Sequence, residues 1–283
     1  MPPRLITLAI LAFWLTMTCW TLYKEVWPRV QPDNPPPFAI DLTDEAQPNG
    51  PNHIIWNLSI NGQTGIYHLE TWVVFSPKED LFELHSDMWP IIDAAGHISK
   101  LAQMGMLSTV VVNREGELKS LEMKLIPPLP PPPLNGEPRI VLMGTVKDGS
   151  LIPRILAPER NFDKTFDPIP IKTRGSILNP LQPLNRLPNL KPGQKWRMPV
   201  VDPVSQAFGS LLPLSSGYVR TFEAEVLPDL KYLRWKEQDV ACLVIEYTGD
   251  DASGNTWVRE SDGLVLQQEV TIGGKVLNLR RDQ

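Results

Sequence analysis

The C-terminal end of the chain carries a turn signal between its apolar segments. Residues 256–260, 264–270 and 275–280 are separated by Asp262-Gly263 and Gly273-Gly274, dipeptides that tight hairpins favour because their central residues adopt positive φ. Residues 240–247 are apolar at both alternating sets of positions, which predicts a strand covered on both faces. The pattern predicts a four-strand antiparallel meander, whose apolar face needs further structure to bury it.

The register of this meander follows from its last turn. If Gly273-Gly274 forms a two-residue turn, Val270 lies opposite Leu277. Four apolar positions should then share one face of the sheet: Leu264, Leu266, Leu277 and Leu279.

A second meander begins the domain that we predict over residues 52–283. Residues 53–60, 66–75 and 81–88 alternate and are separated by polar turn segments, which indicates three strands. Pairing Phe75 with Phe82 defines a core face: Tyr67, Leu69, Val73, Phe75, Phe82, Leu84 and Met88.

Further strands are predicted between these two meanders. Their ranges are 106–112, 117–126, 139–146, 150–156, 195–201 and 219–227, and residues 92–104 are predicted to hold a short helix. The expected fold is mainly β: a curved antiparallel sheet or half-open β-barrel with one or two short helices.

Proline is in excess, since 30 of 283 residues are proline where about 5% is usual. Because proline is excluded from helix interiors and central strands, we expect a proline-rich spacer at residues 28–51 and proline-rich loops at 127–134 and 160–192. The run at 127–134 also fits a polyproline ligand for an SH3-like partner, although such a run is more often a stiff loop.

The N-terminal segment predicts a single transmembrane anchor over residues 1–27. Residues 5–23 contain no charged side chain and would form a helix about 28 Å long, which is close to the thickness of a bilayer core. The alternative is a cleaved secretory signal, for which Thr16 to Cys19 is a poor cleavage site. Flanking charges nearly balance, so the charge rule does not fix the orientation.

Charge and motif content exclude several classes of function. The net charge of −5 gives no basic footprint for nucleic acid. The two cysteines, Cys19 and Cys242, lie in segments that are not expected to meet, so no disulfide is predicted. No standard catalytic or nucleotide-binding motif is present, so we predict no catalytic residue and no cofactor, and we favour a protein that is not an enzyme.

One polar face suggests chemistry. Opposite the core face, one strand carries His68, Glu70 and Trp72, and its partner carries Glu83, His85 and Asp87. With Glu70 facing Asp87 and Trp72 facing His85, the side chains of His68, Glu70, His85 and Asp87 could converge on zinc or iron, which prefer mixed nitrogen and oxygen ligands. The alternative is a solvated sheet face, where alternation places polar residues in any case.

Three segments resemble a known family. WNLSINGQTGIYHLETWVVF, NLKPGQKWRMPVVDP and TWVRESDGLVLQQEVTIGGKVLNL resemble an uncharacterised bacterial cell-envelope family that is distantly similar to the periplasmic lipoprotein-localisation carriers. The resemblance implies a half-open β-barrel on the periplasmic side, with a concave apolar interior that could hold an acyl chain. The chain departs from the carriers in its apparent anchor, its proline-rich inserts and its lack of clear helices to plug the barrel.

We therefore expect a membrane-anchored envelope protein that binds a lipid, a lipoprotein or another envelope component on a concave sheet. The tryptophans could line a cavity or simply fill a core. Two alternatives remain open: a metal-assisted hydrolase built on the His/carboxylate face, and a protein-interaction scaffold that uses the 160–192 loop.

Overall fold

The structure is a computed structural model, and it describes most of the predicted domain. The described residues are 4–22, 52–91, 105–114, 117–126, 140–170, 183, 185–187, 189–201, 219–250, 252–272 and 274–282. The predicted helix at 92–104, the loop at 127–134 and the whole spacer at 28–51 lie outside the described residues.

The described elements are one α-helix, one short 3₁₀ helix and a series of β-strands. They are α1 (Arg4–Thr21), β1 (Ile54–Ile60), β2 (Gln63–Ser76), β3 (Leu81–Pro90), β4 (Gly105–Asn113), β5 (Leu118–Ile126), β6 (Ile140–Lys147), β7 (Ser150–Ala157), η2 (Pro158–Arg160), β8 (Phe162–Thr165), β9 (Ile169–Pro170), β10 (Lys195–Val201), β11 (Val219–Val226), β12 (Lys231–Trp235), β13 (Gln238–Thr248), β14 (Ala252–Arg259), β15 (Val265–Ile272) and β16 (Lys275–Arg281).

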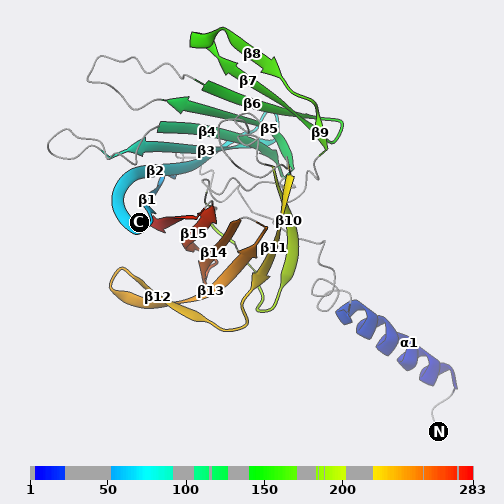
Figure 1. Cartoon of the computed structure of the whole chain (residues 1–283). Helices are drawn as coiled ribbons and strands as arrows, with labels where there is room; N and C mark the ends of the chain where they lie inside the picture. Colours follow the sequence, from blue (N-terminus) through cyan, green and yellow to red (C-terminus); the bar gives the residue numbers. More distant parts are fainter. Residues whose placement is uncertain are drawn as a thin grey trace.

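All the strands belong to one antiparallel sheet of 16 strands that does not close. Its order is β10-β11-β13-β14-β15-β16-β1-β2-β3-β4-β5-β6-β7-β8, with β12 added to β13 and β9 added to β7. The sheet bends at β1 and β2, so that β3 to β8 form one wing and β10 to β15 the other (Figure 1). The predicted curved, mainly β fold is confirmed at this level.

Pairing of the first meander follows the predicted register. Phe75 lies opposite Phe82, and their rings are 4.8 Å apart between centroids. Of the predicted core face, Tyr67, Leu69, Val73, Phe82 and Leu84 are buried, and Phe75 and Met88 pack partly buried against the core. Alternation therefore assigned the buried face of β2 and β3 correctly.

The second meander shows a correction at one position. Val270 lies opposite Leu277, as expected. The pairing of β14 with β15 shifts between Trp257 and Val258, however, and places Val258 opposite Val265. Such a bulge changes which residues point to each face.

Because of this bulge, the four leucines do not share one face. Leu279 packs with Val265 in the largest core cluster, with Leu277 against it. Leu264 and Leu266 pack instead with Cys242, on the opposite face of β13 from Leu243. The prediction that β13 is covered on both faces is confirmed.

Three short strands were missed by the sequence analysis. β12 forms a hairpin with β13 through Lys236 and Glu237, which have φ of 47° and 62°. A left-handed turn usually carries asparagine or glycine, so this one has no sequence signal. Within the predicted loop at 160–192, β8 and β9 pair with β7; at four and two residues, they are too short for alternation to be visible.

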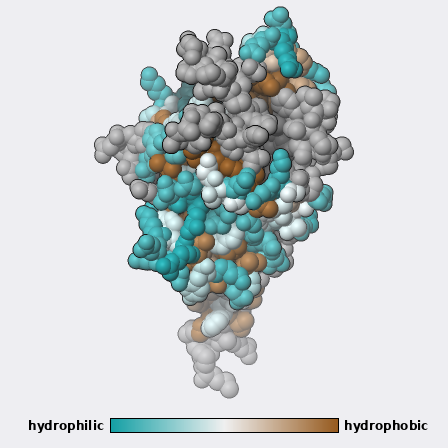
Figure 2. Space-filling model, turned by 60° about the vertical axis from the view of Figure 1, so that its left-hand side comes forward, coloured by the Kyte–Doolittle hydropathy of each residue, from teal (hydrophilic) through white to brown (hydrophobic). Residues whose placement is uncertain are grey.

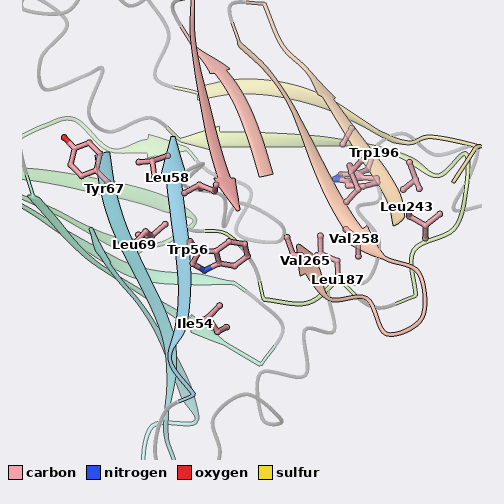
Figure 3. Packing of buried hydrophobic residues seen from close by; sticks show 14 of the residues in the cluster. Ile54, Trp56, Leu58, Tyr67, Leu69, Leu187, Trp196, Leu243, Val258 and Val265 are labelled. Atoms are coloured by element: carbon pink, nitrogen blue, oxygen red, sulfur yellow. The ribbon is translucent and has the colours of Figure 1, made fainter. Parts of the chain in front are cut away.

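The largest core cluster lies at the bend of the sheet. It joins Trp56 and Leu69 from β1 and β2 to Leu243 and Val265 from the other wing, and Leu187 enters from a separate segment (Figure 3). Trp56 and Leu69 are both 0% exposed. Side chains from both wings therefore fill this part of the interior.

The two ends of the sheet carry charged pairs. On β10, Lys195 contacts Glu225 at 2.8 Å and Arg197 contacts Glu223 at 3.3 Å. At the other end, Arg154 of β7 contacts Asp163 of β8 at 2.6 Å. Charges of this kind are usual on edge strands.

The N-terminal helix α1 begins at Arg4 and ends at Thr21. Among the helices that the structure describes, none meets the requirements of length and apolarity for a membrane span. The membrane anchor at residues 1–27 stays a prediction.

Replacing Gly254 by alanine should destabilise the fold, because a Cβ atom at this position of β14 would lie 2.6 Å from the carbonyl oxygen of Glu269. We expect Gly254→Ala to lower the free energy of unfolding by about 1–3 kcal/mol, as measured by urea denaturation. The exposed neighbour Ser253 provides the control, since Ser253→Ala should change the free energy of unfolding by less than about 0.5 kcal/mol. Equal effects of the two variants would contradict the close packing of β14 on β15.

Candidate functional site

The polar face of β2 and β3 has the geometry that the sequence predicted. Glu70 lies opposite Asp87, Trp72 opposite His85, and His68 opposite Trp89. All these residues alternate with the core-facing ones, so their side chains lie on the outer face of the sheet.

Three aromatic rings stack on this face. The ring centroids of His53 and Trp72 are 4.9 Å apart with planes at 17°, and those of Trp72 and His85 are 5.0 Å apart with planes at 8°. The indole of Trp72 is therefore held between two imidazoles. We refer to these three residues as the ring stack.

The sequence analysis missed His53. This residue directly precedes β1, whereas the predicted ligands all come from β2 and β3. Ile54 pairs with Thr71, so extending the β1–β2 register by one residue brings His53 opposite Trp72. The register of the first hairpin was the signal that could have found it.

Polar contacts fix both imidazoles. The Nδ1 atom of His53 lies 2.8 Å from Oε1 of Glu70. In His85, Nε2 lies 3.2 Å from Oε2 of Glu83, and Nδ1 lies 3.2 Å from the hydroxyl of Thr109 on β4. Both ring nitrogens of His85 thus have protein partners.

Asp87 lies on this face, opposite Glu70. Its pKa is raised, mainly because burial disfavours the charged form, with a further increase from the facing carboxylate of Glu70. The imidazoles of His85 and His53 act in the opposite direction and lower the pKa. Burial outweighs the two histidines.

The predicted ligand set does not come together around one point. His68 lies opposite Asn57 and Trp89, and the row of Glu70 and Asp87 separates it from the ring stack. Within the described ranges, no group of three histidine, cysteine, aspartate or glutamate side chains is placed to hold a metal ion. The metal site formed by His68, Glu70, His85 and Asp87 stays a prediction.

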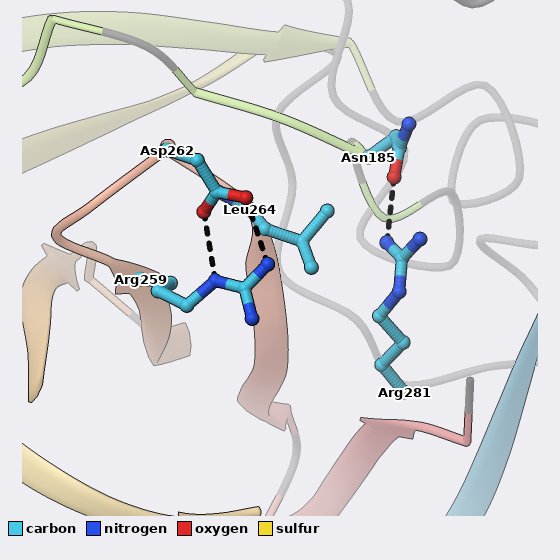
Figure 4. A network of polar contacts seen from close by, with 5 residues as sticks. All are labelled: Asn185, Arg259, Asp262, Leu264 and Arg281. Carbon is cyan, nitrogen blue, oxygen red and sulfur yellow. Dashed lines mark hydrogen bonds and ion pairs between the residues drawn. The ribbon is translucent and has the colours of Figure 1, made fainter. Parts of the chain in front are cut away.

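A second polar network lies at the turn between β14 and β15. The guanidinium of Arg259 donates two hydrogen bonds to the carboxylate of Asp262, at 2.8 and 2.7 Å (Figure 4). It also lies over the ring of Trp235, 5.2 Å from the centroid. Hydrogen bonding to Arg259 lowers the pKa of Asp262, which marks a stabilising ion pair.

The thiol of Cys242 lies beneath this network and is unsuited to catalysis. The residue is 0% exposed, and burial raises the pKa of its thiol to about 11. A thiol is reactive as the thiolate, so Cys242 behaves as a small apolar residue of the core.

Two apolar clusters lie on the inner face of strands β2 to β7, which we call the β2 to β7 wing. One cluster joins Val73, Phe82, Leu84, Val110, Val112, Leu118 and Leu151, and a second joins Met106, Met123, Leu142 and Ile155. Among the described residues, neither cluster includes a side chain from β10 to β16. Hydrophobic residues also reach the molecular surface as a band on the face shown in Figure 2.

Comparisons with known proteins give no family. No protein-family model matches the chain, and no curated protein matches it. A solved structure, the crystal structure of a β-barrel-like protein of a domain of unknown function (DUF1849) from Brucella abortus, covers 82% of this chain and 96% of its own, with 10% sequence identity and a TM-score of 0.43. At this level the similarity carries no argument about function, and the resemblance to lipoprotein-localisation carriers stays a prediction.

The raised pKa of Asp87 predicts a pH dependence of stability. A carboxyl whose pKa is higher in the folded state favours folding while it is protonated, and this contribution is lost as pH rises through the folded-state pKa. At pH 7 the ionised carboxylate therefore opposes folding, so Asp87→Asn should be neutral or stabilising in urea denaturation. Any gain should shrink as pH falls toward about 4, near the pKa of an unperturbed aspartate.

A metal at this face would reverse the result. If Asp87 were a ligand, Asp87→Asn would lower stability at pH 7 in the presence of zinc and change it little in the presence of a chelator. Glu79→Gln, on the turn between β2 and β3, is the control for loss of one carboxylate.

Proposed function

We propose that this protein binds a lipid, a lipoprotein or another apolar component of the cell envelope on the inner face of the β2 to β7 wing. The observation that carries the proposal is the distribution of the core. At the bend, side chains from both wings pack together. On the β2 to β7 wing, the clusters draw their described residues from that wing alone.

The chemistry of this face favours an apolar ligand. The side chains of its two clusters are aliphatic, aromatic or thioether groups, which gain free energy by contact with hydrocarbon at roughly 25 cal/mol per Å² of buried apolar surface. Methionines such as Met106 and Met123 adapt to ligands of different shape because their side chains are flexible. Because the members of both clusters are buried, part of the interior would open before a ligand contacts them.

A membrane location forms the second part of the proposal. The uncharged segment at residues 5–23 and the proline-rich spacer at residues 28–51 would hold the β domain near a bilayer, on its periplasmic side. An anchor of this kind keeps a lipid-binding domain close to its ligand. The support for it is the sequence pattern and the resemblance.

Lipid binding predicts that an acyl species is recovered with the full chain. After extensive washing, organic extraction and mass spectrometry should detect lipid in stoichiometric amount. Val110→Gln, on the inner face of β4, should reduce the recovered lipid severalfold, because it places an amide in the apolar cluster.

The adjacent residue supplies the matched control. Val111 alternates with Val110 and lies on the outer face, so Val111→Gln should leave the recovered lipid unchanged. Circular dichroism must show that both variants are folded. A folded wild-type chain that carries no lipid would contradict the proposal and favour the scaffold interpretation.

The anchor is tested separately by membrane fractionation. The full chain should stay in the membrane pellet after carbonate extraction, and Leu11→Arg should move it to the supernatant, because a charge near the bilayer centre costs about 2.5–3.5 kcal/mol. Gln31→Arg lies outside the predicted anchor and should have no effect. A wild-type chain found in the supernatant would contradict the anchor and leave lipid binding untouched.

A further inference from the structure

The hairpin of β12 and β13 has a free edge. Among the described strands, β12 pairs with β13 alone, and the hairpin lies at the periphery of the molecule (Figure 1). The end strand β10 contains Pro199, whereas β12 contains no proline. Every residue of β12 therefore keeps a backbone N–H with which a further strand could pair.

The turn of this hairpin determines which backbone groups point to the free edge. Trp235 and Gln238 flank the two-residue turn and pair with each other, so they form a hydrogen-bonded pair. Hydrogen-bonded and non-hydrogen-bonded pairs alternate along an antiparallel ladder. The N–H and C=O groups of Tyr232 and Arg234 therefore point away from β13.

Two observed hydrogen bonds agree with this assignment. The carbonyl oxygen of Arg234 accepts a hydrogen bond from the guanidinium of Arg280. Ala241 lies opposite Tyr232, and its carbonyl oxygen accepts from the N–H of Glu260, on the far side of the hairpin. Because a carbonyl oxygen has two lone pairs, that of Arg234 can accept from a second donor.

The side chains along this edge are exposed to solvent. Tyr232 is 73% exposed, and no other large hydrophobic side chain that the structure describes is more exposed. The guanidinium of Arg234 lies 3.7 Å from the carboxylate of Asp239, and both side chains are exposed, so this ion pair contributes little. Tyrosine and arginine are enriched in protein interfaces, which favours a protein partner at this edge.

The sequence of β12 is complementary to itself in the antiparallel direction. It reads Lys231, Tyr232, Leu233, Arg234 and Trp235. When two copies pair about a two-fold axis at Leu233, Tyr232 of each copy faces Arg234 of the other, and Lys231 faces Trp235. Each cation then meets an aromatic side chain, which attracts it electrostatically.

The neighbouring registers lack this complementarity. Only residues whose backbone groups point to the shared edge can form its hydrogen-bonded pairs, and Tyr232 and Arg234 both do so. An axis at Arg234 would place two guanidinium groups opposite each other, which is unfavourable. An axis at Tyr232 would leave Arg234 opposite Leu230 and would lose the pairs between cation and aromatic ring.

We propose that β12 is a contact between two copies of this chain, which pair through their β12 strands in antiparallel orientation with Leu233 at the two-fold axis. This inference goes beyond the proposed function and does not depend on it. The strand has five residues, and stable interfaces bury about 1,200 Å² or more, so the association is weak. It closes at the dimer, because each free edge is covered by the other.

Opposite charges at residue 232 test the register by sedimentation velocity of the full chain in detergent. The average mass of the wild type should rise with protein concentration. Tyr232→Lys should weaken self-association about tenfold, because a second cation faces Arg234 in both symmetric pairs. Tyr232→Glu should keep the affinity within about threefold, because a carboxylate faces the same guanidinium. Phe162→Lys, at an exposed aromatic residue of β8, is the matched control and should have no effect.

Disulfide crosslinking in a Cys19→Ser background tests the position of the axis. Leu233→Cys should form a covalent dimer on mild oxidation, because the two Cα atoms of a non-hydrogen-bonded pair lie about 4.5 Å apart, within the range of a disulfide. Lys236→Cys, in the turn of the same hairpin, is the control, since its two copies would lie roughly 20 Å apart. The remaining cysteine, Cys242, is buried.

The results decide the inference once urea denaturation has shown that each variant is folded. Equal losses of self-association in Tyr232→Lys and Tyr232→Glu, or no loss in Tyr232→Lys, would overturn it. A wild-type chain that stays monomeric at every concentration, with no crosslink at residue 233, would also overturn it. Lipid recovery is measured separately, so none of these outcomes bears on the proposed function.

Discussion

Strand β1 holds the molecule together, because it is hydrogen-bonded along both of its edges. It pairs with β16 on one side and with β2 on the other, so it connects the first and last strands of the domain. Its residue Trp56 is 0% exposed and contacts side chains from both neighbouring strands. Each wing extends from this strand by local hairpins, and the relative placement of the wings depends on it.

The two wings differ in what their apolar faces contact. At the bend and in the β10 to β15 wing, the interior is filled by side chains from several elements. In the β2 to β7 wing, the described clusters come from one sheet face. The proposed ligand face and the part of the core that joins the two wings thus lie in different parts of one continuous sheet.

Local patterns predicted the hairpins, because turn residues and alternation act over a few positions. Phe75 opposite Phe82 and Val270 opposite Leu277 followed from turn length alone. The pairing of β1 with β16 joins the two ends of the domain and has no local signal. The bulge at Trp257 was not predicted, because side-chain packing decides it. The turn at Lys236 was not predicted either, because it lacks glycine. On the candidate metal face, the facing pairs were predicted and the contribution of His53 was not.

The charged pairs at the ends of the sheet have a consequence for behaviour at high concentration. An open sheet offers unpaired backbone groups to another copy of itself, which is the route to fibrils. One end of the sheet carries the charged residues Lys195, Arg197 and Glu223, and the other end carries Arg154 and Asp163. These side chains would have to lose their bound water before two copies of the sheet could pair. Pro199 also lacks a backbone N–H. These charges and this proline make these two edges of the open sheet resist pairing with another copy of the chain.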